Sequence, residues 1–165
     1  MNVEAIDHLV LTVKDIDVTC SFYARVLGMN VTTFHGSRKA LSFGVQKINL
    51  HPYGKEFDPK AQAPTPGSAD LCFVTSVPIP DVTKHLASCG VNLLEGPVHR
   101  TGSRGPMVSV YFRDPDGNLI EVSKYGEALR RYRCFFGPHD YEDDHNHGGD
   151  QCQSRKDTSR IEQDE

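Results

Sequence analysis

Glu121 is an acidic residue in the middle of an otherwise apolar segment. The stretch "NLIEV" (118–122) has the composition of a strand, with Glu121 between Ile120 and Val122. A carboxylate in a half-buried strand costs free energy unless it is paired or binds a metal ion. The position of Glu121 therefore indicates a functional group.

An internal duplication connects Glu121 with three other polar residues. With an offset of 62 residues, "LGMNV" (27–31) falls on "CGVNL" (89–93), and "DHLVLTV" (7–13) falls on "ADLCFVT" (69–75). With an offset of 70, "INLHP" (48–52) falls on "NLIEV". The overlay matches His8 with Asp70 and His51 with Glu121. Two imidazoles and two carboxylates form a plausible ligand shell for a divalent metal ion.

Each half of the duplication predicts the element order βαβββ. In the first half we expect a strand at 6–13, a helix from Asp15 or Asp17 to Leu27, and strands at 29–35, 40–45 and 47–53. In the second half we expect a strand at 69–75, a helix at 78–90, a strand at 91–98, a loop at 100–106 and a hairpin at 107–125 turned by Asp116-Gly117. The segment 56–68, rich in proline and polar residues, is interpreted as a linker or exposed loop.

Side chains alternate between the two faces of a strand, which decides where the four polar residues point. Leu9, Leu11 and Val13 are expected to face the helix of their unit, so His8 faces away from it. By the same alternation Glu121 and His51 face away from the helices. If two such sheets curl toward each other, the four candidate ligands converge.

Composition excludes several classes of function. The chain of 165 residues has a net charge of −4 and no clustered basic face, which argues against a nucleic-acid partner. No apolar run approaches the length of a membrane span, and the N-terminus lacks the features of a secretory signal. Five cysteines without CxxC spacing indicate a reducing, intracellular and cytoplasmic environment. After Tyr125 the chain becomes strongly polar, and residues 126–165 are expected to be a disordered tail.

Two segments resemble the vicinal oxygen chelate superfamily, which includes glyoxalase I, fosfomycin-resistance thiol transferases and extradiol dioxygenases. They are "IDHLVLTVKDIDVTCSFYARVLGM" (6–29) and "YFRDPDGNLIEV" (111–122). The resemblance covers residues 4–125 and implies one α+β domain of two βαβββ modules that form a curled open sheet. It also implies a divalent metal ion (Zn, Ni, Mn or Fe) that chelates vicinal oxygens of a small substrate as a Lewis acid.

The resemblance implies metal ligands on the first and last strands of each module, here His8, His51, Asp70 and Glu121. Glu121 is also the candidate catalytic base. Two positions depart from the pattern, because His51 stands where glyoxalase I has a carboxylate and Asp70 stands where several members have a histidine. Members often pair modules across a homodimer, in which case His8 and His51 come from one chain and Asp70 and Glu121 from the other.

Four further residues are candidates for binding the substrate. Arg100 and Arg104 lie in "HRTGSRGPM" (99–107) and could hold an anionic group, and Lys47 and Asn49 share the face of His51. We expect a glyoxalase-like enzyme of lyase, isomerase or thiol-transfer type. An Fe(II) extradiol-type dioxygenase and a metal-free small-molecule binding module are the alternatives.

Overall fold

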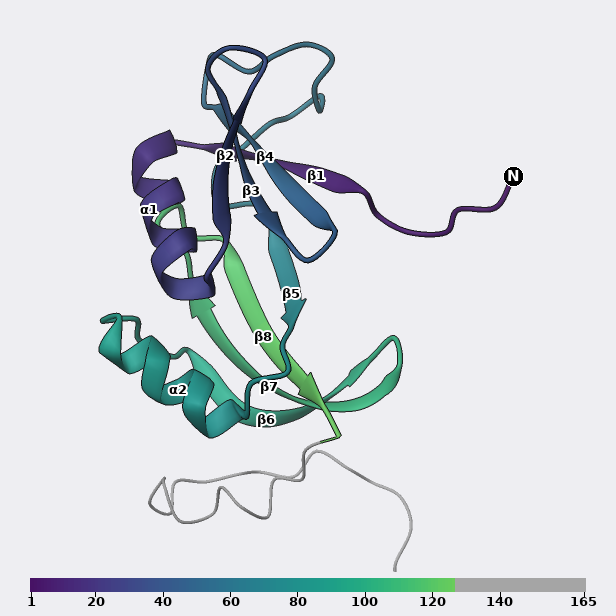
Figure 1. Ribbon diagram of the computed structural model, residues 1–165, viewed down its shortest axis with the longest axis vertical. Helices are drawn as coiled ribbons and strands as arrows, with labels where there is room; N and C mark the ends of the chain where they lie inside the picture. Colours follow the sequence, from purple (N-terminus) through teal and green to yellow (C-terminus); the bar gives the residue numbers. More distant parts are fainter. Residues whose placement is uncertain (127–165) are drawn as a thin grey trace, which may run out of the picture. The chain divides into compact units, whose positions relative to one another are not determined.

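The computed structural model describes residues 1–126 and has the predicted order of strands and helices (Figure 1). The first module consists of β1 (His8–Val13), α1 (Ile16–Leu27), β2 (Asn30–Phe34), β3 (Arg38–Phe43) and β4 (Gln46–Pro52). The second consists of β5 (Asp70–Val74), α2 (Ile79–Ser88), β6 (Glu95–Gly102), β7 (Gly105–Arg113) and β8 (Leu119–Tyr125). The α+β prediction of two βαβββ modules is confirmed. Apart from Gly126, the predicted tail lies outside the described residues.

Each module has its own four-stranded sheet, and both sheets have the same topology. The strand orders are β1-β4-β3-β2 and β5-β8-β7-β6. The first and last strands of each module are parallel neighbours, whereas the other pairs are antiparallel. Residues from a module's first and last strands therefore lie side by side on its sheet.

The helix α1 begins and ends where its sequence predicts. Of the two candidate caps, the structure selects Asp15, whose Oδ1 accepts hydrogen bonds of 2.9 Å from the backbone N–H groups of Asp17 and Val18. Gly28 ends the helix with φ = 66°, a left-handed conformation that glycine adopts without strain. In α2 no side chain caps the N-terminus, and a proline occupies the first turn.

The helix-facing sides of both sheets share one hydrophobic core. Leu11 and Val13 from β1 are buried together with Val110, Phe112 and other residues of the second module. The predicted inward alternation on β1 and β8 is thereby confirmed. A buried hydrogen bond of 2.9 Å, from the Tyr23 hydroxyl to the Asp114 carboxylate, also joins α1 to the turn before β8.

One element of the second module differs from its prediction. The strand expected at 91–98 begins only at Glu95, and it continues through Gly102 into the expected loop. Pairing between β6 and β7 extends to Gly102 and Gly105, which leaves only two residues for the turn. Gly105 has φ = 114°, a conformation that favours glycine and allows this short connection. Arg100 consequently lies on a strand and not in a loop.

Among residues 1–126, no helix is long and apolar enough to cross a membrane.

Candidate functional site

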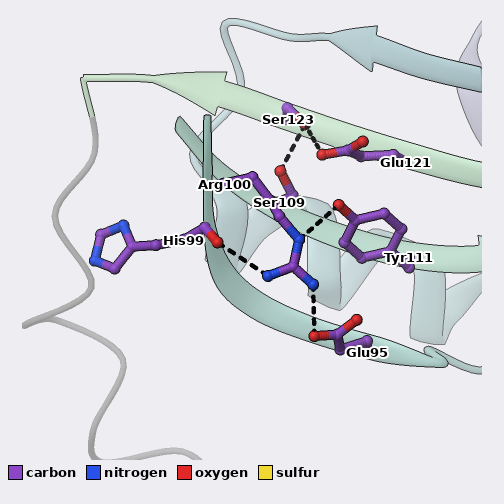
Figure 2. Close-up of polar contacts among 7 residues, drawn as sticks. All are labelled: Glu95, His99, Arg100, Ser109, Tyr111, Glu121 and Ser123. Atoms are coloured by element: carbon purple, nitrogen blue, oxygen red, sulfur yellow. Dashed lines mark hydrogen bonds and ion pairs between the residues drawn. The ribbon is translucent and has the colours of Figure 1, made fainter. Parts of the chain in front are cut away.

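Glu121 lies on the open face of the second sheet, which is the face turned away from α2. Its carboxylate accepts a hydrogen bond of 3.0 Å from the Ser123 hydroxyl, and Ser123 is in turn hydrogen-bonded to Ser109 at 2.8 Å (Figure 2). The Cys72 thiol, directly across on β5, lies 3.3 Å from the same Ser123 hydroxyl. Neighbouring strands thus surround the half-buried carboxylate with polar groups.

These neighbours decide the charge of Glu121. Burial alone raises the pKa of its carboxyl group, but hydrogen bonds from Ser109, Tyr111, Ser123 and Cys72 outweigh burial and lower the pKa on balance. Burial raises the pKa of the Cys72 thiol, so this neighbour is a protonated donor at neutral pH. Glu121 is therefore an ionised carboxylate at neutral pH, which is the form that binds cations.

Arg100 is engaged by its own sheet. Its guanidinium donates from Nε to the Tyr111 hydroxyl at 3.0 Å, from one Nη to the His99 carbonyl at 3.0 Å, and from the other to Glu95 at 2.7 Å (Figure 2). Because arginine can only donate, the Tyr111 proton is left to point toward Glu121. Arg100 thus orients Tyr111.

Arg104 and Lys47 both contact aromatic rings. The Arg104 guanidinium lies 4.3 Å from the centre of the Tyr125 ring, and the Lys47 ammonium lies 4.7 Å from that of Phe34. Each cation is thus held against an aromatic ring of its own module.

The pairing register corrects the overlay of the last strands. His8 pairs with Lys47 on β4, and Asp70 pairs with Leu119 on β8. The position two residues beyond that partner is Asn49 in the first module and Glu121 in the second. Asn49, and not His51, is therefore the structural equivalent of Glu121, and the true offset between these strands is 72.

The register also separates His51 from His8. His51 pairs with Thr12, four residues along the strand from the pairing of His8. At about 3.3 Å per residue this amounts to about 13 Å, which is too far for both imidazoles to bind one ion. Residues two apart on a strand point to the same face, so the alternation of side chains is equally consistent with an offset of 70 and of 72 between β4 and β8. The register of each strand with the first strand of its module distinguishes the two offsets.

Asn49 carries an unusual oxygen. Among the residues that the structure describes, its side-chain Oδ1 is the buried side-chain polar atom without a hydrogen-bond partner. An unpaired buried oxygen costs free energy, so this atom calls for an explanation. Amide and carboxylate oxygens both bind hard divalent cations, which makes Asn49 a chemically suitable counterpart of Glu121.

His8 is oriented as metal-binding histidines usually are. Its Nδ1 is hydrogen-bonded to the Asp7 carboxylate at 2.6 Å, and its side chain is 45% exposed. A carboxylate bonded to Nδ1 in this way fixes the ring tautomer and leaves Nε2 for an ion. His8 therefore fits a ligand role. Asp70 is exposed on the edge strand β5, diagonal to Glu121.

His51 is buried under the linker that follows β4. Its ring meets the Phe57 ring edge-on, with centres 5.2 Å apart, and the Arg38 guanidinium lies 3.9 Å from the centre of the same ring. Burial, followed by the charge of Arg38, lowers the pKa of His51. The imidazole is therefore neutral at physiological pH.

The candidate ligands form two half-sites on two sheets. His8 and Asn49 lie on the open face of the first sheet, and Asp70 and Glu121 on that of the second. Within residues 1–126, no three histidine, cysteine or acidic side chains lie close enough together to hold one ion. One chain therefore does not bring the predicted ligands together, and the convergence expected from curling sheets is not seen within it.

Sequence reasoning missed the residues that surround Glu121. Ser109 and Tyr111 lie on β7, opposite Ser123 and Glu121 in the register. The tight turn before β8 was recognised, and counting back from it would have placed these two residues beside Glu121. The contact of Phe57 with His51 had no such signal, because a loop has no periodicity.

The chain is similar to a known protein family and to solved structures. The model of the Glyoxalase/Bleomycin resistance protein/Dioxygenase superfamily matches residues 5–122. The virulence protein STM3117 of Salmonella typhimurium is 59% identical over 125 residues, covering 76% of this chain and 87% of that protein. The crystal structure of STM3117 superposes on this protein with a TM-score of 0.75. The superposition covers 76% of this chain and 99% of the STM3117 chain.

Two other relatives are a glyoxalase domain-containing protein and a metallothiol transferase. The glyoxalase domain-containing protein RDO1 of Mycosarcoma maydis is 57% identical over 128 residues, covering 78% of this chain and 72% of RDO1. The metallothiol transferase FosB of Bacillus licheniformis is 31% identical over 118 residues, covering 71% of this chain and 73% of FosB. The chain therefore belongs to the glyoxalase, bleomycin resistance protein and dioxygenase superfamily.

Proposed function

We propose that the protein is a glyoxalase-like, metal-dependent enzyme of lyase, isomerase or thiol-transfer type that acts on a small substrate with vicinal oxygens. The observation that carries this proposal is the equivalence of two residue pairs, His8 with Asn49 and Asp70 with Glu121. Each pair spans the parallel first and last strands of its sheet in the same register. The similarity to FosB, a metallothiol transferase, is consistent with metal chemistry on this fold.

The four proposed ligands are His8, Asn49, Asp70 and Glu121. A divalent metal ion bound there would supply Lewis-acid polarisation of substrate oxygens. The donor set contains one imidazole and three oxygens, which suits Mn, Fe, Ni or Zn. The sequence predicted His51 as a fourth ligand. Because His51 lies four residues along the strand pair from His8, we propose that it binds the substrate and not the metal ion.

Glu121 is also the proposed base. It is ionised at neutral pH, and its neighbours Ser123 and Tyr111 hold the carboxylate in place. A carboxylate fixed in this way can accept a proton from a substrate carbon or thiol and return it at another position. Arg100 supports this role by orienting Tyr111, whereas Lys47 and Arg104 are proposed to attract an anionic part of the substrate.

The complete site requires two copies of the chain in this proposal. One copy would supply His8 and Asn49, and its partner would supply Asp70 and Glu121. A twofold axis would then create two identical sites in a homodimer. Both half-sites lie on open sheet faces, and Val74 on the second sheet is also exposed and available for contact.

The test is a titration of the metal-stripped, full-length protein with Mn²⁺, Fe²⁺, Ni²⁺ and Zn²⁺ by calorimetry. We expect one ion to bind per chain, and Glu121→Gln to weaken binding at least about tenfold. Asp81→Asn, which removes a carboxylate of the surface ion pair with Lys84 on α2, is the matched control and should not change the affinity. All three proteins keep the same histidine-containing tail, so the tail cancels from the comparison.

The outcomes separate the proposal from its alternatives. A marked preference for Fe²⁺, with O₂ uptake in the presence of a catechol, would favour the dioxygenase. Equal affinities of wild type, Glu121→Gln and Asp81→Asn would contradict the proposal and favour a binding module without a metal.

A further inference from the structure

A cavity of about 570 Å³ lies beside the half-site of the first sheet. One wall is the open face of that sheet, with Val10 and Thr12 on β1 and His51 on β4. The opposite wall is the linker between β4 and β5, which is drawn as a long irregular loop beyond the end of β4 (Figure 1). The volume falls within the range of about 300–1,000 Å³ typical of small-molecule sites.

The linker wall is fastened at its N-terminal end. Glu56 accepts hydrogen bonds from the backbone N–H of Gly54 at 2.8 Å and from the Lys60 ammonium at 3.1 Å. Phe57 is held against both His51 and the Arg38 guanidinium. A segment interpreted from sequence as a linker is thus tied to the sheet that it covers.

The C-terminal end of the linker is fastened as well. The Ser68 hydroxyl donates to the Thr65 carbonyl at 2.7 Å, and the backbone N–H of Ala69 donates to the side chain of the buried Asn118 at 2.9 Å. With both ends held, the wall has a defined position relative to Thr12 and His51.

The lining divides into an apolar part and a polar part. Val10 on the sheet and Pro59, Ala61, Ala63 and Pro64 on the linker provide apolar surface. The polar groups include the Thr12 hydroxyl, the His51 imidazole and Lys60, whose ammonium retains two N–H donors beyond the bond to Glu56. The remaining polar lining residues are Thr65, Ser68 and Asn118. The polar part therefore offers hydrogen-bond donors, and the Lys60 ammonium, although paired with Glu56, is a cation within reach of a carboxylate in the cavity.

The cavity and the proposed metal half-site share one sheet face. His8, Val10 and Thr12 alternate along β1, so the lining begins only two residues from His8. A molecule in the cavity would extend from the half-site toward Lys60. The identification of this molecule as the substrate rests on the proposed function, whereas its binding does not require a metal.

We infer that this cavity is a binding pocket for a small carboxylate with an aliphatic body. The carboxylate is held by Lys60 and Thr12, and the aliphatic body lies against Val10 and the alanines and prolines of the linker. His51 closes the polar end of the pocket beneath Phe57. The pocket sets the substrate class of the enzyme to aliphatic acids.

The test compares octanoate with octanamide, a neutral molecule of the same shape, on the metal-free full-length protein. Octanoate should bind once per chain by calorimetry and raise the melting temperature. Octanamide should bind at least about tenfold more weakly, because it lacks the charge that Lys60 recognises. Equal binding of the two molecules, or no binding of octanoate, would overturn the inference.

Variants of the linker locate the binding. Ala61→Trp fills the cavity and should abolish octanoate binding, whereas Gln62→Trp, next to it but outside the lining, should leave binding unchanged. Lys60→Met should weaken binding, and Lys55→Met, an exposed lysine of the same segment, should not. Unchanged binding in Ala61→Trp with a retained melting temperature would place octanoate elsewhere and contradict the assignment.

The metal titration keeps this test distinct from that of the proposed function. Octanoate binding that persists in a protein unable to bind metal ions would leave the pocket standing and overturn the metal-dependent enzyme. Metal binding without octanoate binding would overturn the pocket and leave the enzyme standing.

Discussion

At the scale of single residues, Glu121 has a charge that follows from its hydrogen bonds. Serine, tyrosine and cysteine side chains all donate toward its carboxylate, and their combined effect exceeds the cost of burial. The sequence predicted that Glu121 points away from the helices, because the alternation of side chains along β8 determines this direction. Ser123, two residues along the same strand, shares that face by the same alternation. The sequence did not predict the donors from β5 and β7, because the pattern of one strand does not reveal which strands pair with it.

The lowered pKa of Glu121 predicts a pH dependence of stability. Its folded-state pKa lies below the ordinary value of 4.5, so the stabilisation is present above pH 4.5 and is lost as pH falls through the folded-state pKa. In metal-free protein, the melting temperature of wild type should therefore fall more steeply below pH 4.5 than that of Glu121→Gln. Parallel melting curves of the two proteins over this range would contradict the assignment of Glu121 as a stabilised carboxylate.

Asn49 offers a prediction that separates a ligand from a packing residue. Asn49→Asp places a carboxylate at the position equivalent to Glu121, so the affinity for Mn²⁺ should rise by about tenfold or more. Without metal, the same substitution should lower the melting temperature, because a buried charge without a partner is unfavourable. Calorimetry and thermal unfolding measure both effects. A lower melting temperature without any gain in metal affinity would remove Asn49 from the site.

At the scale of elements, local signals predicted the helices and the order of the strands, but not every boundary. The caps Asp15 and Gly28 delimit α1 as their residue types suggest. The hairpin of β6 and β7 was misplaced, because Arg100 and its polar neighbours resemble a loop while their backbones continue the ladder. His51 was misaligned with Glu121 for a related reason, since a shift of two residues preserves the face of every side chain.

The two candidate caps of α1 can be distinguished by stability. Asp15→Ala removes the acceptor of two backbone N–H groups and should lower the free energy of unfolding by about 1 kcal/mol. Asp17→Ala removes only a favourable charge in the first turn and should cost less, about 0.3–1 kcal/mol at low salt. Urea unfolding at low and high salt measures the two costs. A larger loss for Asp17→Ala would contradict the cap seen in the structure.

At the scale of the whole molecule, duplication produces two similar half-sites that one chain does not bring together. The shared core, with the bond between Tyr23 and Asp114, joins the modules through their helix-facing sides. The open faces, which carry His8 and Glu121, therefore remain available to contact another protein surface. The sequence could predict that both modules carry candidate ligands, but the convergence of these residues depends on module packing, which has no local signal. In the proposed homodimer, a second copy would supply the missing ligands symmetrically.

The most direct test is the metal content of a heterodimer in which one copy carries His8→Ala and the other carries Glu121→Ala. The two copies are co-expressed with different tags that lack histidine and are purified through both tags. A site shared between chains retains one intact set of ligands in this heterodimer, so it should bind about half the metal of the wild-type dimer, while each variant alone binds none. A heterodimer without metal, beside a wild type that binds it, would contradict a site built from both chains.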